Sequence, residues 1–365
     1  GDAKVVADLI RREADVNRVE VDGSTALQWA VYNSDLDIVE RLINAGADAE
    51  VTNREGISPL ILAVQAGDAE IARYLLNHGA AVDKVLPNGE TPLMMAARTG
   101  NVETLQVILD AGAKAGDEID ATENLRGTTA LMWAAANKNA DAVALLIANG
   151  ANVAATSATT RPGRNPYLAP TARERIRQAF DDRGFGKLTE NPEGLTDGSP
   201  HSRAEVLARI PGNLLEDFEK DVDNPSPPPP RKEWGGLSAL HFAVREGDMD
   251  TIRVLVEAGA DVNQLSEFGW SPLLIATQNR YYQIGKYLLE KGANPNLAND
   301  GGWNPLYIAT DNRNIEGGDY PTRKPDMDHL EYIKALLTAG ADPDIRMNSS
   351  TETRTIFTHQ WLREE

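Results

Sequence analysis

Few side chains of this 365-residue chain are spaced in a way that supports catalysis or metal binding. The chain contains no Cys, which excludes disulfides, thiolate-bound metals and cysteine nucleophiles. No two histidines have the spacing of metal ligands; they are His78, His201, His241, His329 and His359. Residues 183–187 lack the spacing of a phosphate-binding loop, and residues 221–225 and 311–314 lack ligands that a calcium loop requires. We therefore expect no catalytic residue, no metal site and no cofactor, and predict that the protein is not an enzyme.

The charge of the chain narrows the classes of partner. Asp and Glu total 55 against 36 Lys and Arg, which gives a formal net charge of -19. A protein that binds nucleic-acid backbones needs a basic surface, so we expect no nucleic-acid partner. The sequence has no run of 18 apolar residues and predicts no membrane span, and residues 1–9 lack the features of a signal peptide. The acidity and the absence of Cys slightly favour a periplasmic or extracellular location, with the cytoplasm left open.

A Gly-Ala pair recurs along the chain in a constant register. The pairs begin at Gly46, Gly79, Gly112, Gly150, Gly259, Gly292 and Gly340. Their intervals of 33, 33, 38, 109, 33 and 48 residues indicate a 33-residue repeat with insertions of 5, 76 and 15 residues. A second landmark, in which a Ser, Thr or Asn stands two residues before a Leu, keeps the same register. It occurs at Thr25, Ser58, Thr91, Thr129, Ser238, Ser271 and Asn304.

Each repeat predicts two helices and a turn. The Ser, Thr or Asn can cap the first helix, and the Pro that follows it in four copies has no N–H to leave unpaired. An apolar pair before each landmark Gly, such as Leu75-Leu76, gives the second helix a buried stripe. The Gly can then end that helix in the left-handed conformation. Turn-rich segments such as residues 87–89 follow and predict hairpin-like loops.

These landmarks resemble the ankyrin repeat family, and in particular its multi-repeat bacterial proteins. The Thr-Pro-Leu-His, Ala-Ala and Gly-Ala-Asp-Val-Asn motifs of the family are closest at residues 91–97, 238–244 and 259–263. The resemblance implies an all-α solenoid of stacked helix-turn-helix units with loops at right angles, and a protein that binds other proteins. The motif's His is present only at His241, and other residues such as Gln28 replace it elsewhere. This puts the family's usual hydrogen bonds between repeats in question.

The spacing divides the chain into four parts. Residues 1–154 hold a first unit that lacks its first helix, followed by four complete repeats, and residues 155–233 form a Pro-rich insertion with short helices. Residues 234–345 hold three further repeats, the last with an insertion near 314–328, and residues 346–365 form a capping helix or the start of another repeat. Because the array starts in the middle of a unit, we expect the chain to be a fragment of a longer protein.

The resemblance also implies where a protein partner would bind. In such repeats the residue after the loop Gly and the residues after the Ala pair line the binding surface. The first position predicts an apolar row of Leu237, Trp270 and Trp303, with Trp234 and Phe268 close by. The second position contributes Tyr32, Arg98, Arg245 and Gln278. Aromatic and Arg side chains dominate interface energetics. The rings at the loop positions could instead pack against the next loop. We assign Trp29 and Trp133, which lie within the expected first helices, to packing between repeat units.

The 76-residue insertion leaves several interpretations open. It contains 11 of the 20 Pro residues, which favours a poorly ordered linker. Its basic part, with Arg173, Arg175, Arg177 and Arg183, could instead dock onto the acidic repeats of this molecule or of a partner. The proline run at residues 227–230 could also lie along the tryptophans. We favour a module or scaffold that binds a protein partner through its concave face and loop tips. The alternatives are a structural subunit of a homo- or hetero-oligomer joined through the insertion, and a regulatory part of a larger enzyme.

Overall fold

The computed structural model describes residues 3–112, 119–158, 235–314 and 323–346. The chain divides into two units, one made of residues 1–162 with 233–365 and the other of residues 163–232. All of the described residues belong to the first unit. Trp234 and the four insertion arginines, Arg173, Arg175, Arg177 and Arg183, lie outside the described residues.

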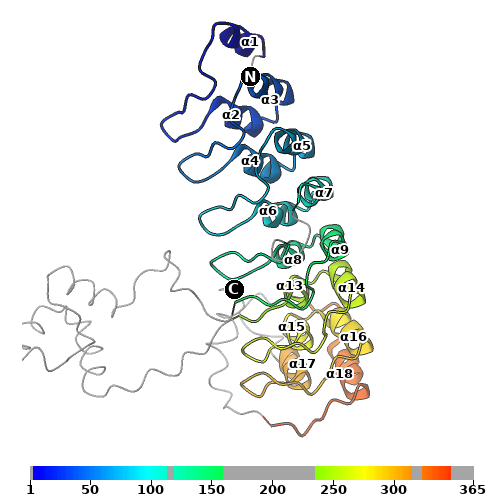
Figure 1. The fold of residues 1–365 in the computed structure, drawn as a ribbon. Helices are drawn as coiled ribbons and strands as arrows, with labels where there is room; N and C mark the ends of the chain where they lie inside the picture. The colour runs from blue at the N-terminus through cyan, green and yellow to red at the C-terminus, as the bar shows by residue number, and fades with distance from the viewer. Residues whose placement is uncertain (1–2, 113–118, 159–234, 315–322, 347–365) are drawn as a thin grey trace, which may run out of the picture. The chain divides into compact units, whose positions relative to one another are not determined.

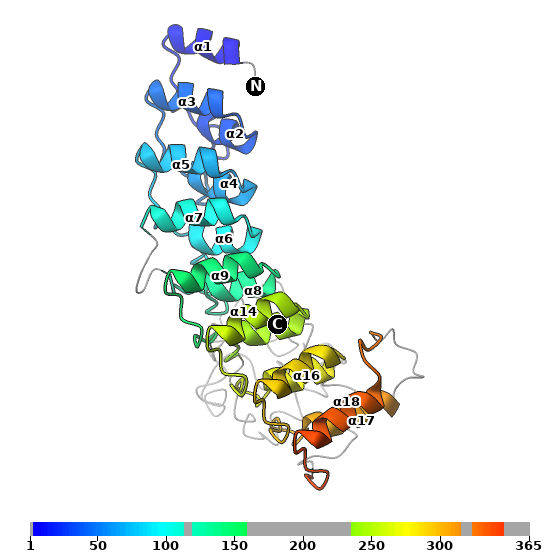
Figure 2. The same cartoon turned by 90° about the vertical axis from the view of Figure 1, so that its right-hand side faces the viewer.

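The helices of the first unit stack in two columns (Figures 1 and 2). One column holds the first helix of each repeat: α2 (Ala26–Tyr32), α4 (Pro59–Ala66), α6 (Pro92–Thr99), α8 (Ala130–Ala136), α13 (Ala239–Glu246), α15 (Pro272–Gln278) and α17 (Pro305–Asn314). The other holds the second helices: α1 (Ala3–Arg11), α3 (Leu36–Asn44), α5 (Ala69–Asn77), α7 (Val102–Asp110), α9 (Ala140–Ala148), α14 (Met249–Glu257), α16 (Tyr282–Glu290) and α18 (His329–Thr338). The predicted all-α solenoid is confirmed, and α8 packs on α13 across the long insertion.

The predicted helix boundaries are also confirmed. Ser58 and Thr91 precede the first helices α4 and α6, and their hydroxyl groups accept the backbone N–H groups of Ile61 and Met94 at 3.3 and 3.2 Å. Satisfying these otherwise unpaired amides stabilises a helix start by about 1 kcal/mol. At the other end, Gly79 follows α5 with a φ of 97°, a conformation that side-chain-bearing residues rarely adopt. The landmark residues of the sequence therefore mark where helices begin and end.

Neighbouring repeats share one apolar core. The Leu two residues after each cap is no more than 2% exposed in six repeats; these residues are Leu27, Leu60, Leu93, Leu131, Leu240 and Leu273. On the second helices Leu75, Leu146 and Leu288 are fully buried. Full burial of such a side chain contributes about 1.5–3 kcal/mol. A repeat that loses its neighbours would expose this core, so each repeat depends on the next for its stability.

Side-chain hydrogen bonds link neighbouring repeats at both His241 and Gln28. His241 Nδ1 accepts the backbone N–H of Ser238 at 3.1 Å, so its proton resides on Nε2, which donates to the Trp270 carbonyl of the next repeat at 3.1 Å. Gln28 Oε1 accepts the backbone N–H of Thr25 at 2.9 Å, and its Nε2 donates to the Ile57 carbonyl at 2.7 Å. The amide thus forms the same two bonds as the imidazole. Losing the His of the family motif does not break the link between repeats at Gln28.

The loops between repeats are hairpins, each closed by a backbone hydrogen bond. In the loop after α16, for example, the Asn299 N–H donates to the Trp303 carbonyl at 3.1 Å. The loop that carries the long insertion keeps the same bond: the Ser157 N–H donates to the Leu237 carbonyl at 2.9 Å. The Leu237 N–H donates to Ser157 Oγ at 3.1 Å, although the two residues are 80 positions apart in the sequence. The insertion therefore leaves the hairpin closed at its base.

Both flanks of the long insertion are held by the adjacent hairpins. The Ala158 N–H donates to the Arg126 carbonyl of the preceding hairpin at 2.8 Å, and the Glu267 N–H of the following hairpin donates to the Gly235 carbonyl at 3.1 Å. Residues 155–158, which we expected in the insertion, thus belong to the hairpin. Without residues 159–234 the loop would read Ser-Ala-Gly-Gly-Leu, the same length as the hairpin of residues 299–303. The insertion therefore lies at the tip of a hairpin whose length otherwise matches that of its neighbour.

The insertion in the last repeat is anchored at its base by Arg280. This side chain is only 5% exposed, and its Nη1 and Nη2 donate to the carbonyls of Arg323 and Asn312, each at 3.1 Å. Asn312 Nδ2 in turn donates to the Thr277 carbonyl at 2.8 Å. Both flanks of residues 315–322 are thereby tied to the preceding repeat. The helices α17 and α18 keep their places in the two columns.

The buried His241 makes the array sensitive to acid. Burial lowers the pKa of His241 from 6.5 to about 4. Between these two values only the unfolded chain gains the proton, so the contribution of His241 is complete above pH 6.5 and is lost as the pH falls toward 4. The loss reaches about 3 kcal/mol. We expect His241→Gln, which copies Gln28, to match the wild type in urea unfolding at pH 7 and to be more stable at pH 5; equal acid sensitivity of the two chains would contradict this.

The closed hairpin predicts that the array tolerates removal of the insertion. A chain in which Ala158 is joined directly to Gly235 should retain the helical circular dichroism of the repeats and unfold at a temperature no lower than the intact chain. The physical reason is that a shorter loop costs less closure entropy while the Ser157–Leu237 bond is kept. Direct joining of Ala155 to Gly235 removes Ser157 and serves as the matched control, with a lower unfolding temperature expected.

Light scattering of the intact chain and of the chain that lacks residues 159–234 tests self-association through the insertion. If the insertion joins copies of the chain, the intact protein has a multiple of the monomer mass and the chain lacking residues 159–234 is a monomer. A monomer in both cases removes the structural-subunit alternative.

Candidate functional site

The first helices present one set of side chains to the same side of the array. Side chains four and seven residues after the cap lie on one face of a helix, because residues three apart are neighbours on its surface. We call this surface the first-helix face. Four residues after the caps it contains Trp29, Leu62, Met95, Trp133, Phe242, Ile275 and Ile308. Seven residues after the caps it contains Tyr32, Gln65, Arg98, Ala136, Arg245, Gln278 and Asp311.

Side chains of one repeat cover the apolar residue of the next repeat on this face. The guanidinium carbon of Arg98 on α6 lies 5.1 Å from the ring centre of Trp133 on α8. Gln65 on α4 makes the corresponding contact with Met95 on α6, with its Nε2 3.8 Å from the sulfur. A cation over an aromatic face contributes about 0.5–1 kcal/mol where it is exposed. At Gln65 and Arg98 the side chain seven residues after the cap therefore packs on the next repeat and keeps a polar end at the surface.

A buried carboxylate positions Trp133 from the loop side. The indole Nε1–H of Trp133 donates to Thr128 Oγ1 at 2.8 Å. The Thr128 hydroxyl donates in turn to Glu123 Oε1 at 2.8 Å, and Glu123 is only 5% exposed. Glu123 also accepts the backbone N–H groups of Leu125, Arg126 and Thr128. These bonds fix the loop before α8 and hold the ring of Trp133 beneath Arg98. The sequence pattern gave no indication of this network, because Glu123 lies outside the repeat motif.

At α2 the same positions form an exposed aromatic pair. Trp29 is 48% exposed and Tyr32 is 67% exposed. Their rings meet edge to face, with centres 5.9 Å apart and an angle of 79°. We expected Trp29 to pack between repeats. This stays a prediction, because the unit before α2 is described only by its second helix, α1.

The other predicted residues of this set lie on α13 and α15. Arg245 lies 4.9 Å from the ring centre of Phe242 in the same helix, and its Nε is 3.2 Å from Glu246 Oε1. Gln278, at the end of α15, is partly exposed. Tyr32, Arg98, Arg245 and Gln278 thus occupy equivalent positions on one column of helices.

The predicted apolar row at the hairpin loops is only partly present. Leu237 is 8% exposed and belongs to the apolar core, so it does not contribute to an exposed row as we expected. The reason is that the closed hairpin at Ser157 brings Leu237 down onto the helices. Trp270 packs partly against the core, and Phe268 and Trp303 are also partly buried. Trp234 lies outside the described residues, so its place in the row is untested.

Comparison with protein families explains the repeated architecture. The family model "Ankyrin repeats (3 copies)" matches residues 1–85, 80–157, 214–299 and 240–347, more than half of the chain. The chain belongs to the ankyrin repeat family. Ankyrin repeats generally mediate protein–protein interactions, and their folds are typically non-enzymatic modules. The bacterial origin that we inferred stays a prediction.

Two solved ankyrin repeat domains share the fold of this chain. The ankyrin repeat domain of Bcl-3 aligns with a TM-score of 0.53 and 20% sequence identity, covering 87% of this chain and 99% of that domain. The human ASB11 ankyrin repeat domain aligns with a TM-score of 0.54 and 18% identity, covering 88% of this chain and all of that domain. At these identities the similarity concerns the fold alone.

Curated relatives match parts of the ankyrin array. Human protein phosphatase 1 regulatory subunit 27 is 46% identical over 52 residues, which are 14% of this chain and 34% of that protein. Human mitochondrial disaggregase is 27% identical over 176 residues, which are 46% of this chain and 22% of that protein. The chain thus spans about a third or less of the length of these relatives.

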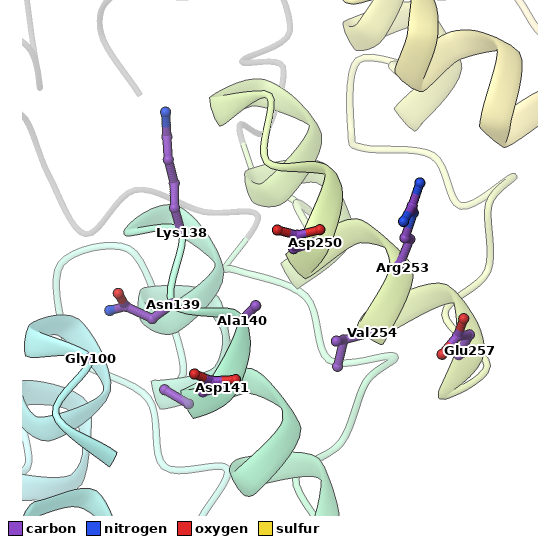
Figure 3. A pocket seen from close by; sticks show the side chains of 10 residues that line it. Gly100, Lys138, Asn139, Ala140, Asp141, Asp250, Arg253, Val254 and Glu257 are labelled. Atoms are coloured by element: carbon purple, nitrogen blue, oxygen red, sulfur yellow. The ribbon is translucent and has the colours of Figure 1, made fainter.

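An open groove of about 590 Å³ lies between the second helices α9 and α14 (Figure 3). Its charged lining residues are Lys138, Asp141, Asp250, Arg253 and Glu257. Both signs of charge are mixed along it, and Figure 3 shows Asp141 and Asp250 on the two facing helices. The groove therefore favours no single class of ligand, and it lies in the column of second helices rather than on the first-helix face.

The described residues contain no group of three or more His, Asp or Glu side chains placed to hold a metal ion. None of the described helices is both long and apolar enough to cross a membrane.

The Glu123 network predicts a specific loss of stability. Glu123→Ala removes the acceptor of three backbone N–H groups and of the Thr128 hydroxyl, so we expect the free energy of unfolding to fall by about 3 kcal/mol. Glu55→Ala, which truncates an exposed Glu at another hairpin, is the matched control and should change it by less than about 0.5 kcal/mol. Urea unfolding of both variants checks this. Equal stability of the two would show that the buried carboxylate adds little to the array.

Proposed function

We propose that this protein is an interaction module that binds a segment of a protein partner along the first-helix face and the adjoining hairpin loops. The exposed ring of Tyr32, in line with Arg98, Arg245 and Gln278 on one column of helices, carries the proposal. Leaving a large aromatic side chain in water forgoes the stabilisation that its burial would give. Aromatic residues with such exposure on a regular, rigid surface are typical anchors of protein interfaces.

The rest of the first-helix face supports the same function. Arg98, Arg245 and Gln278 follow at equivalent positions, so aromatic, cationic and amide groups are presented from helices of one column. Such a mixture gives apolar contact area together with directional hydrogen bonds. The stacked repeats hold these groups in fixed register, which lowers the entropy lost when a partner binds.

The curated relatives support a regulatory setting for this module. One of them is named as a regulatory subunit of a protein phosphatase, and another, a disaggregase, is a much longer protein that matches this chain over 22% of its length. The second candidate function is therefore a regulatory part of a larger enzyme. In that case too, the first-helix face is the surface that we expect to bind the target.

Affinity capture from the native source with matched variants tests the proposed function. We expect proteins captured by the wild type to be lost with Tyr32→Ala, because the aromatic anchor is removed. Val102→Ala, which truncates a 40% exposed residue on the second helix α7, is the control and should capture the same proteins. Circular dichroism verifies that all three chains keep their helices. Identical capture by all three would rule out this end of the first-helix face as the binding surface.

A further inference from the structure

Neighbouring hairpin loops are joined near their tips by one backbone hydrogen bond. In each case the N–H of the second hairpin residue donates to the carbonyl that precedes the Gly of the hairpin before it. The described bonds run from Arg54 to Asp22, from Asn124 to Asn88, from Ala158 to Arg126, from Glu267 to Gly235 and from Asp300 to Phe268, at 2.8–3.1 Å. Each of these bonds fixes the distance between two adjacent tips.

Pro87 removes this bond from one junction. It occupies the second position of the hairpin at residues 86–90, and proline has no N–H to donate. The carbonyl that would accept the bond belongs to Glu55, and no described residue donates to it. The hairpins at residues 53–57 and 86–90 keep their own closing bonds, at 3.1 and 2.9 Å. Each hairpin is therefore intact, and only the connection between the two is missing. We call this connection the Pro87 junction.

The side-chain link between repeats is missing at the same junction. Gln28 and His241, each three residues after a cap, donate to a carbonyl of the next hairpin. The equivalent residue before the Pro87 junction is Ile61, which is buried and has no group that could donate. Of the six junctions between hairpins that the structure describes, the Pro87 junction alone has neither the backbone bond nor the side-chain bond.

The proline ring makes a different kind of contact with the preceding hairpin. A Cβ atom placed on Gly56 would lie 3.1 Å from Pro87 Cδ, so the ring packs closely against this glycine. Apolar contact has no preferred direction, whereas a hydrogen bond weakens steeply when its angle changes. The two tips can therefore shift relative to each other more easily than tips that share a backbone bond.

On the side of the second helices, the same two repeats are firmly connected. The Asn101 side chain, which precedes α7, donates through Nδ2 to the Gly67 carbonyl at 2.9 Å. Arg73 on α5 pairs with Glu103 on α7 at 3.3 Å. The hairpins extend from the first helices on the side away from the second helices (Figure 1). The Pro87 junction is thus held at the helices and is without a bond at the hairpin tips.

We propose that the Pro87 junction is a hinge of the array. The repeats before and after it tilt about the contact between α5 and α7, and the hairpin tips at residues 53–57 and 86–90 change their separation. Tyr32 and Gln65 lie before the hinge and Arg98 lies after it, so the tilt changes the spacing of these groups on the first-helix face. The hinge itself is independent of the proposed function, whereas its use in fitting a partner rests on that function.

Distances between spin labels test the hinge. Because the chain contains no Cys, pairs of introduced cysteines can be labelled selectively. Val19→Cys/Val85→Cys spans the Pro87 junction and one bonded junction, and both positions are more than half exposed. Val85→Cys/Thr156→Cys spans two bonded junctions and is the matched control. By double electron–electron resonance we expect a broader distance distribution for the first pair than for the control pair.

Two further substitutions move the missing bond. Pro87→Ala restores an N–H opposite the Glu55 carbonyl and should narrow the Val19/Val85 distribution to the width of the control pair. Asn124→Pro removes the bond to Asn88 and should broaden the Val85/Thr156 distribution; Pro87 shows that a proline fits this hairpin position. Circular dichroism verifies that the labelled chains keep their helices.

Three results would overturn the hinge. They are equal widths for the two label pairs, a Val19/Val85 distribution that Pro87→Ala leaves unchanged, and an unchanged Val85/Thr156 distribution in a folded Asn124→Pro chain. None of these measurements involves a partner, and capture with Tyr32→Ala does not depend on the hinge. The proposed function and the hinge can therefore fail separately.

Discussion

The structure depends on apolar surface that no single repeat can bury by itself. A unit of two short helices has one leucine-lined side toward each neighbour, and residues such as Leu75, Leu146 and Leu288 reach full burial only between units. Helices of seven to ten residues are marginal in isolation, so packing, not propensity, supplies their stability. This constraint makes the register of the repeat strict, because a shift of one residue would turn the leucines away from the neighbouring unit. It leaves free to vary the positions seven residues after each cap, which are exposed or partly exposed on the first-helix face.

The hairpin tips are not subject to the packing constraint between helices, which explains why the array tolerates the long insertion at a hairpin tip. Helix packing fixes the base of each loop, whereas the tip touches neighbouring hairpins through a few backbone bonds such as that from Ala158 to Arg126. An insertion at the tip therefore needs only the closing bond between Ser157 and Leu237 to leave the array intact. The last repeat accepts its insertion differently. There the chain is interrupted between two helices, and the buried guanidinium of Arg280 holds both flanks.

The sequence predicted the fold in detail because the repeat is enforced by packing. Helix starts at Ser58 and Thr91, the helix end at Gly79 and the buried leucines all follow from residue types that recur in register. It was less informative about single side chains whose neighbours come from another unit. The burial of Leu237 depends on a hairpin closed across 80 positions, and the packing of Arg98 on Trp133 joins two different repeats. The Gln28 bonds could have been inferred, because an amide can place an acceptor and a donor where an imidazole does.

The same packing rule connects stability with recognition on the first-helix face. Gln65 and Arg98, seven residues after their caps, pack on the next repeat and also meet solvent, two roles that suit long side chains with a polar end. Stacking on Met95 or Trp133 restricts the rotamers of these side chains before any partner arrives, so less entropy remains to be lost on binding. The array therefore needs no separate scaffold for a binding site: the contacts that join one repeat to the next also orient the groups that face a partner. Variation at this one position can change the chemistry of the surface while the buried leucines keep the fold.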